Sequence, residues 1–367
     1  MVKSMVSGVA GLRSHQAKMD VIGNNISNVN TYGFKSSRAS FRDALYVTST
    51  GASNATATYG GGNPMQTGYG STIGSIDPMH VRGAFMPTDY PTDCMINGQG
   101  FFLVGPNLGP LAVNMVTSLN LTRVGSFVFD GAGNFVDMNR NLVYGFTAVP
   151  SWTQLEIGGV PQFEKMVDPA YVMPLIEDPP ASGIFVPDPT YLYPPIPDPD
   201  NPGSYLPNPK DPALYIDNPA RPIMYVESYS YDYGVVEPLV IPNDYFGNPL
   251  ILKQITIGPD GSIIGIDDDN NIVEVGKIAV ANVPNPSALE MSSNSYFIAK
   301  ANTGEILASV PGENTTGSLQ AGGLEMSNVD LAKEFTEMIT TQRGFQANTR
   351  IITVTDEMLA ELVNMKR

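Results

Sequence analysis

Acidic and amide side chains gather most densely at Asp267-Asp-Asp-Asn-Asn271. Carboxylate and carbonyl oxygens this close together are the ligands that Ca²⁺ takes, and two carboxylates could also serve in glycoside hydrolysis. The run lacks the glycine and the late glutamate of an EF-hand loop, and Trp152 is the only tryptophan that could offer a sugar platform. Because apolar runs flank the cluster on both sides, we interpret it as the loop of a β-hairpin.

Two histidines, His15 and His80, and one cysteine, Cys94, are the other candidates for metal binding or catalysis. They are too few for a zinc site built from cysteine and histidine, and no Asp-His-Ser or Cys-His spacing joins them. A single cysteine also excludes an intramolecular disulfide. We predict two structural or surface histidines and a buried thiol, with no metal, no cofactor and no enzymatic activity.

The composition limits the classes of partner. The chain has 367 residues, 42% of them apolar, which is enough for the cores of two or three domains of about 150 residues each. A net charge of −16 repels nucleic-acid phosphate and anionic lipid, so we expect no nucleic acid and no membrane as partner. With 36 glycines and 31 prolines, the composition is typical of turn-rich β-structure. No run resembles a membrane span or a signal peptide, so we expect a protein that stays inside the cell or is exported without a cleaved signal.

Both ends of the chain carry apolar residues at the spacing of a helix stripe, recurring every seven positions from Met5 to Ile26 and from Leu331 to Leu359. Polar residues such as Gln16 interrupt both stripes, so each helix alone should be marginal and the ends of the monomer disordered. We predict that the stripes are assembly contacts that become buried only between copies of the chain. The predicted contact residues are Val2, Met5, Val9, Leu12, Met19, Ile26, Leu331, Phe335, Met338, Phe345, Ile352 and Leu359.

Local signals predict where the two helices begin and end. Ser327 and Asp330 are N-cap candidates, and Glu334 suits the positive end of a helix dipole, so we expect the C-terminal helix at about 328 to 365. The N-terminal helix is expected to end between Thr31 and Phe34.

Between the helices, short apolar runs alternate with turn residues. Cys94-Met-Ile and Phe101-Phe-Leu-Val104 flank Asn97-Gly98, which predicts a β-hairpin with a two-residue turn. Ser126 to Val136 repeats this pattern, and Ile255 to Val310 forms a second block of the same kind. We predict that the strands of both blocks form one β-domain.

Two stretches lack the residues of a core. Ser49 to Gly74 consists largely of Gly, Ser, Thr, Asn and Ala, so we expect an extended arm or loop. Residues 147–250 hold 21 of the 31 prolines, with triplets such as Pro187-Asp-Pro189 recurring every ten residues. Because proline removes ladder donors, we predict a loop-rich outer domain of extended segments, with a PxxP ligand for a partner as the alternative.

This organisation predicts an α+β, mainly β fold with nested layers. The terminal helices pair as a coiled-coil-like inner domain, followed by a β-rich middle domain and a Pro-rich inserted outer domain of strands and loops. The predicted domains are 1–34 with 324–367 for the helical core, 35–72 for the arm, 73–146 with 251–323 for the middle domain, and 147–250 for the outer domain.

Motifs at both ends resemble those of one protein family. Met19 to Lys35 resembles the N-terminal motif of the bacterial flagellar axial proteins, the rod and hook family. Gly323 to Phe335 and Met338 to Asn348 are similar to the C-terminal motif of the same family. Shorter stretches extend the likeness through the β-rich blocks, namely Asn63 to Gly70, Ile96 to Phe102 and Leu121 to Phe127.

Within this family the hook members are the better match, because of the closing residues Leu362 to Arg367 and the large insertion; a distal rod subunit is the alternative. The resemblance implies a structural subunit that assembles into a helical tube and acts as a flexible universal joint, carrying motor torque to the filament. It also implies export through the flagellar type III apparatus without a cleaved signal and a place in the extracellular hook. The implied partners are further copies of the chain, the distal rod protein, the hook cap and the hook–filament junction proteins. A secreted Pro-rich adhesion module is the alternative from a different class.

Overall fold

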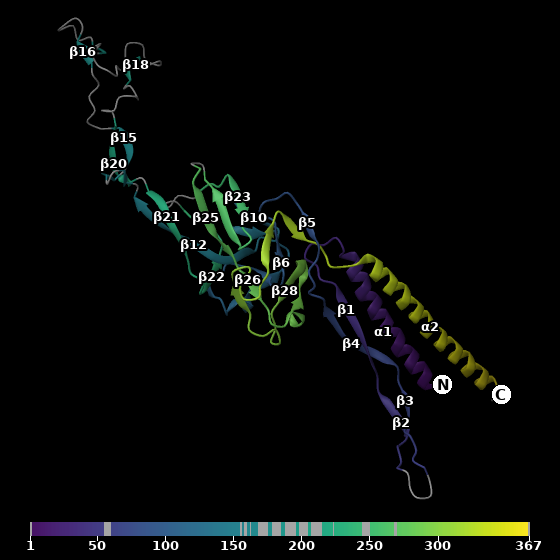
Figure 1. The fold of residues 1–367 in the computed structure, drawn as a ribbon. Helices are drawn as coiled ribbons and strands as arrows, with labels where there is room; N and C mark the ends of the chain where they lie inside the picture. Colours follow the sequence, from purple (N-terminus) through teal and green to yellow (C-terminus); the bar gives the residue numbers. More distant parts are fainter. Residues whose placement is uncertain are drawn as a thin grey trace. The chain divides into compact units, whose positions relative to one another are not determined.

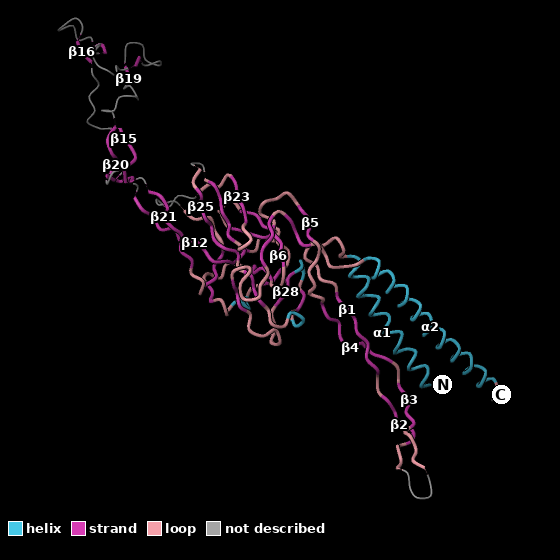
Figure 2. The backbone as a smooth tube through the Cα atoms, in the orientation of Figure 1, coloured by secondary structure: helices cyan, strands magenta, loops and turns pink. Residues whose placement is uncertain are grey.

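The computed structural model of the chain describes residues 2–54, 60–154, 156–157, 160–161, 163–167, 175–177, 185–187, 196–197, 205–206, 215–222, 224–243, 250–267 and 270–365. The chain divides into two compact units. The first comprises Met1–Ala148, Tyr231–Asp244 and Asn248–Arg367, and the second comprises Val149–Ser230 and Tyr245–Gly247. Strands predominate in the described residues, and the long helices come from the two chain ends (Figure 2), so the predicted α+β, mainly β class is confirmed.

The two long helices belong to the first unit, where α1 (Val2–Ser27) and α2 (Leu331–Asn364) lie side by side with both chain ends at the same end of the pair (Figure 1). The predicted N-cap of α2 is confirmed, because the Asp330 side chain accepts hydrogen bonds from the backbone N–H groups of Ala332 and Lys333. Helix α1 ends a few residues earlier than predicted, and the turn that follows reaches Gly33, whose φ is +65°.

Beside the helices, the chain forms a long two-stranded ladder. Strand β1 (Ser37–Asp43) pairs antiparallel with β4 (Ser71–Pro78), and β2 (Tyr46–Thr50) pairs antiparallel with β3 (Met65–Gly68). We expected an extended arm or loop from residue 49 to residue 74. The described part of that stretch supplies the end of β2, all of β3 and the start of β4. Backbone hydrogen bonds supply the pairing without a core, because every residue of β2 and β3 is exposed.

A large sheet forms the rest of the first unit. Its main path runs β23-β24-β25-β12-β7-β9-β28-β27, and further strands branch from it. Two shorter ladders, β6 with β30 and β5 with β31, lie beside it. The strands of these sheets are β5 (Phe85–Pro87), β6 (Cys94–Asn97), β7 (Phe101–Gly105), β8 (Leu111–Ala112), β9 (Asn120–Thr122), β10 (Phe127–Phe129), β11 (Phe135–Asp137), β12 (Leu142–Gln154), β22 (Val235–Pro238), β23 (Gln254–Ile257), β24 (Ser262–Ile266), β25 (Ile272–Ile278), β26 (Val280–Asn282), β27 (Glu290–Met291), β28 (Tyr296–Ile298), β29 (Leu307–Ser309), β30 (Ser318–Ala321) and β31 (Gly323–Glu325). Single 3₁₀ turns occur at Val116–Ser118, Pro286–Ala288 and Ser293–Ser295.

Strand β7 lies at the centre of this unit and is buried along its whole length. Phe101 and Leu103 contribute to one hydrophobic cluster, while Phe102 and Val104 contribute to another. Successive side chains of a strand point to opposite faces, so β7 has a core on each side.

The predicted hairpin between β6 and β7 is wrong. Strand β6 pairs with β30, and β7 pairs with β9, β12 and β26. Both strands are buried and need neighbours of their own, and Gly98 and Gly100, with φ values of +143° and +121°, let the chain pass from one sheet to the other.

Two other predicted hairpins are confirmed. Strands β10 and β11 pair antiparallel around a turn in which the Asp130 carboxylate accepts the backbone N–H groups of Ala132 and Asn134. Strands β24 and β25 pair on either side of the acidic cluster, where Asp267 Oδ1 accepts the N–H of Asn271 at 2.8 Å. Asp268 and Asp269 lie outside the described residues.

The second unit contains short antiparallel pairs in its described parts. Its strands, besides the end of β12, are β13 (Glu156–Ile157), β14 (Val160–Pro161), β15 (Phe163–Val167), β16 (Leu175–Glu177), β17 (Phe185–Pro187), β18 (Ile196–Pro197), β19 (Tyr205–Leu206), β20 (Tyr215–Pro222) and β21 (Met224–Tyr231). The partners are β13 with β14, β15 with β20, β16 with β17 and β18 with β19. Proline ends several of these strands, as expected for a residue that cannot donate to a ladder. Most of the predicted triplet repeats lie outside the described residues.

The role of Gly100 between β6 and β7 can be tested by substitution. A Cβ on Gly100 would lie 2.3 Å from Val280 Cγ1, and the φ of +121° strains any side chain. We expect Gly100→Ala to lower the free energy of unfolding by at least about 2 kcal/mol in urea titrations. Gly131→Ala is the matched control, because nothing lies within 4 Å of its Cβ position. Equal stability of the two variants would contradict this account of the sheet change.

Candidate assembly site

The contact between α1 and α2 is made by small residues. A Cβ on Gly11 would lie 2.5 Å from Asn348 Nδ2, and a Cβ on Gly344 would lie 2.6 Å from the His15 ring. Thr341 and Thr355, also on α2, are buried. The two helices therefore approach closely at these small residues, and Ile352 of α2 also packs against Gly8 of α1.

Polar groups also join the two helices. Lys18 Nζ lies 3.1 Å from Glu337 Oε2, and Asn25 Nδ2 donates to Glu334 Oε1 at 3.2 Å. The Lys18–Glu337 pair is partly exposed, so it contributes little to stability. His15, beside Phe41 of β1, has its pKa lowered first by burial and then by Lys18. Pairing of the helices within one chain thus combines these polar contacts with apolar ones, such as that of Ile352 with Gly8.

The predicted contact residues divide into two groups around this pair. Half-buried positions are Met5, Leu12, Met19, Ile26, Met338, Phe345, Ile352 and Leu359. Val9, Leu331 and Phe335 are exposed, and nothing is described of the Val2 side chain. The expectation that all of them are buried only between copies is wrong for Ile352, which packs against Gly8 of the same chain. Their role as contacts between copies stays a prediction.

The heptad pattern missed several exposed apolar residues on α2. Together with two predicted residues, they form two groups of three, spaced four positions apart along the helix, and we call the two groups the ridges. The first ridge adds Ile339 to two predicted residues, and the second is new. The ridges consist of Leu331, Phe335 and Ile339, and of Val354, Met358 and Leu362, all 39–57% exposed. Spacing by four, not by seven, is the signal that identifies them.

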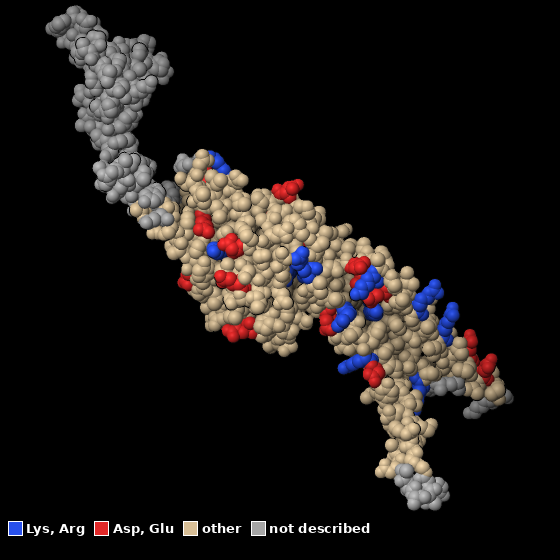
Figure 3. Space-filling model, viewed as in Figure 1, with Lys and Arg blue, Asp and Glu red and all other residues tan. Residues whose placement is uncertain are grey.

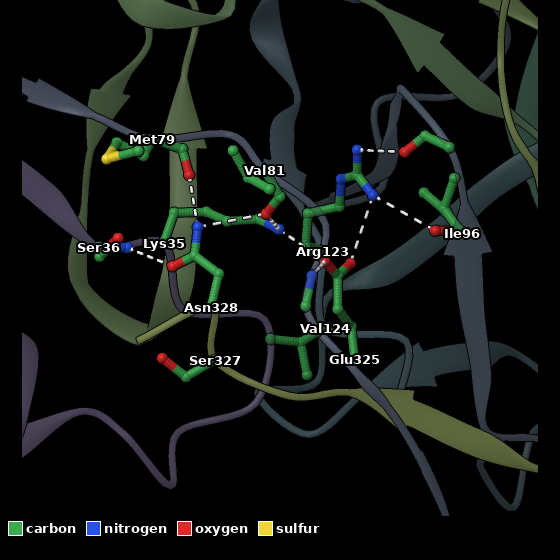
Figure 4. Close-up of polar contacts among 12 residues, drawn as sticks. Lys35, Ser36, Met79, Val81, Ile96, Arg123, Val124, Glu325, Ser327 and Asn328 are labelled. Carbon is green, nitrogen blue, oxygen red and sulfur yellow. Dashed lines mark hydrogen bonds and ion pairs between the residues drawn. The ribbon is translucent and has the colours of Figure 1, made fainter. Parts of the chain in front are cut away.

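A buried charge cluster fixes the place where both helices join the β-structure (Figure 4). Glu325 directly precedes the segment leading to α2, Lys35 follows α1, and Arg123 comes from the large sheet. Lys35 Nζ lies 2.6 Å from Glu325 Oε1, and Arg123 Nη1 lies 3.3 Å from Glu325 Oε2. All three side chains are at most 3% exposed. Burial lowers the pKa of Lys35 and of Arg123, and the Glu325 carboxylate opposes both shifts.

Backbone groups complete the cluster. Lys35 Nζ donates to the carbonyl of Val81, Arg123 Nη2 donates to that of Gly98, and the N–H of Gly83 donates to Glu325 Oε1. Asn328, three residues after Glu325, accepts the N–H of Ser36 and donates to the carbonyls of Met79 and Val81 (Figure 4). The segment that follows α1 and the segment that leads into α2 are therefore tied to the same stretch of chain between β4 and β5.

His80 lies next to this cluster, between the rings of Phe101 and Phe297 at centroid distances of 5.5 and 5.3 Å. Burial lowers its pKa to about 4, and the positive charges of Lys35 and Arg123 add to the shift. The predicted structural role of His80 fits this packing, in which the ring is neutral at physiological pH.

The remaining candidate for chemistry is buried. Cys94 is fully buried in the core, which confirms the predicted buried thiol, and burial raises its pKa, with a further contribution from Asp93. Among the described residues, no group of three His, Cys, Asp or Glu side chains is arranged to hold a metal ion. Neither helix in the described part of the chain is long and apolar enough to cross a membrane.

The charge cluster yields a second test. Glu325→Ala leaves two buried cations without their anion, and we expect a loss of about 3–5 kcal/mol in the free energy of unfolding. Glu290→Ala is the matched control, because the Lys300–Glu290 pair is more than half exposed and its loss should cost less than about 1 kcal/mol. Urea titrations of both variants would measure this difference, and equal losses would contradict the role of the cluster.

His80 predicts a pH dependence. Its pKa in the folded chain, about 4, lies below the unfolded value of 6.5. As the pH falls from 6.5 to 4, the unfolded state binds a proton that the folded state does not, so stability present at neutral pH is lost, by about 2–3 kcal/mol. His80→Phe should lack this loss. The stability difference between wild type and variant, measured from pH 7 to pH 4, isolates the histidine, and a flat difference would contradict the assignment.

Models of known protein families match both helical ends of the chain and the segments that join them to the β-structure. Residues 320–365 match the family model described as flagellar basal body rod FlgEFG protein C-terminal, and residues 5–35 match that of the flagella basal body rod protein. The chain is 32% identical to the flagellar basal-body rod protein FlgG of Bacillus subtilis over the full length of both chains.

Hook proteins are also among the relatives. The flagellar hook protein FlgE of Borreliella burgdorferi is 29% identical, and that of Treponema pallidum is 27% identical, each over the full length of both chains. Similarity to rod and hook proteins thus extends from the first helix to the last. The chain belongs to the flagellar rod and hook protein family, a family of structural components of the bacterial flagellum.

Proposed function

We propose that this chain is a subunit of the flagellar hook, and that its terminal helices join copies of it into a helical tube that bends while transmitting torque. The observation that carries the proposal is the pair of apolar ridges on α2, which the contact with α1 leaves exposed in the single chain. Fully burying an exposed Val, Leu or Met side chain gains about 1.5–3 kcal/mol, and the ridge residues are already about half covered, so contact between copies gains roughly half of this for each of them. Family membership supports a structural role and sets aside the adhesion module.

The export route, the location and the partners of the chain follow from this proposal. The chain would be exported through the flagellar type III apparatus without a cleaved signal and would lie in the extracellular hook. Its partners there would be further copies, the distal rod protein below, and the hook cap and junction proteins above. The ladder of β2 and β3 supports contacts with neighbouring copies, because a two-stranded ladder without a core is marginal unless it lies against another surface.

A distal rod subunit is the second candidate. It is favoured by the alignment to the Bacillus subtilis rod protein, which spans 368 positions, whereas the alignments to the two hook relatives span 450 and 481. The hook relatives therefore have residues that this chain lacks. Electron microscopy of basal bodies from cells without the gene distinguishes the candidates. A complete rod without a hook supports the hook subunit, and a truncated rod supports the rod subunit.

Assembly through the ridges is testable on the purified chain. We expect Val354→Asp with Met358→Asp to raise the concentration needed for polymerisation at least about tenfold, because two apolar contacts per copy are lost. Val128→Asp is the control, since Val128 is 54% exposed on β10, away from the helices. Sedimentation measures polymer, and circular dichroism verifies the folded monomer. Unchanged polymerisation of the ridge variant would contradict the proposal.

A further inference from the structure

Four charged side chains occupy the outward face of α2. Arg343, Arg350, Glu357 and Glu361 are all exposed. With 3.6 residues per turn, they fall within about 40° of one another and nearly opposite Asn348, which faces α1. Figure 3 shows basic groups followed by acidic groups along this helix towards the C-terminus. The face therefore presents two positive charges and then two negative charges.

This arrangement is unfavourable within a single chain. Glu357 and Glu361 are four residues apart, so like charges lie one turn from each other. They also lie close to the negative end of the helix dipole, and the last described turn of α2 has no basic residue to offset it, while Lys366 and Arg367 lie beyond the described residues. None of the four charges forms an ion pair with another described residue. A partner that brings cations to the acidic pair would remove the repulsion.

We propose that this partner is a second copy of the chain, whose Arg343 and Arg350 face Glu357 and Glu361 of the first copy. The inference rests on the proposed assembly and adds its register. Parallel helices in register would place like charges together, whereas a shift of 11 to 14 residues, about 16–21 Å along the axis, places opposite charges together. The charge pattern thus selects a staggered contact.

An antiparallel contact would also match opposite charges, but it would use the same patch on both copies. Such an isologous contact closes as a dimer, whereas a shifted parallel contact leaves a free basic pair on one copy and a free acidic pair on the other. Only the shifted contact continues along a tube. Exposed ion pairs contribute little to affinity, so their role here is to set the register of a contact held by the apolar ridges.

The test compares charge changes on two sides of the same helix turn. Glu357→Lys should raise the polymerisation threshold about tenfold at low salt, because it puts three positive charges on the face. Asp356→Lys makes the same charge change on another side of the helix and should leave the threshold within about twofold of wild type. The fourfold variant R343E/R350E/E357K/E361K, which reverses every charge but keeps the pattern, should polymerise like wild type.

The outcomes separate this inference from the proposed function. If wild type polymerises and Glu357→Lys behaves like Asp356→Lys, the register is wrong while the assembly stands. If the fourfold variant fails to polymerise although circular dichroism shows a folded chain, complementarity between copies is contradicted. A wild-type product limited to dimers in gel filtration overturns the parallel arrangement, and a wild type that stays monomeric overturns the proposed function itself.

Discussion

Burial of the Glu325 carboxylate between two cations is the interaction on which the rest of this structure depends. A buried charge is tolerated only when its partners are in place, and here the partners come from the segment after α1 and from the large sheet. The cluster forms only when the segment after α1, the large sheet and the segment before α2 come together. The helix pair therefore begins at a site that the β-structure prepares, and the direction of both helices follows from that site.

Along the helix pair, the contact of α1 with α2 in one chain and the contact proposed between copies use different residues. The contact within the chain uses glycine, threonine and amide groups, which allow close approach, together with Ile352 against Gly8. Six other large apolar residues of α2 stay exposed in the single chain and form the ridges. Under the proposed function this separation favours assembly, because the ridges are buried only against another copy. The charges on the outward face restrict which of the possible contacts form.

Local features were predictable from the sequence, and distant ones were not. The N-cap at Asp330, the turn at Asp130 and the loop at Asp267 depend on residues a few positions apart, and the structure confirms each. The hairpin between β6 and β7 failed because β30, the true partner of β6, lies far along the chain. Lys35 and Glu325, separated by 290 positions, carry no sequence signal of their pairing. The heptad spacing predicted the terminal helices but only two of the six ridge residues. The spacing of apolar residues in one helix does not show which of its faces the other helix covers.

The position of Cys94 has a consequence for the chemical durability of the protein. The thiol is enclosed by a hydrophobic cluster of the core, and burial keeps it in the unreactive protonated form. Oxidants and thiol reagents reach it only when the structure around β6 opens. The chain therefore carries a built-in reporter whose alkylation would measure such openings, and while folded it does not offer this thiol for cross-linking to its neighbours.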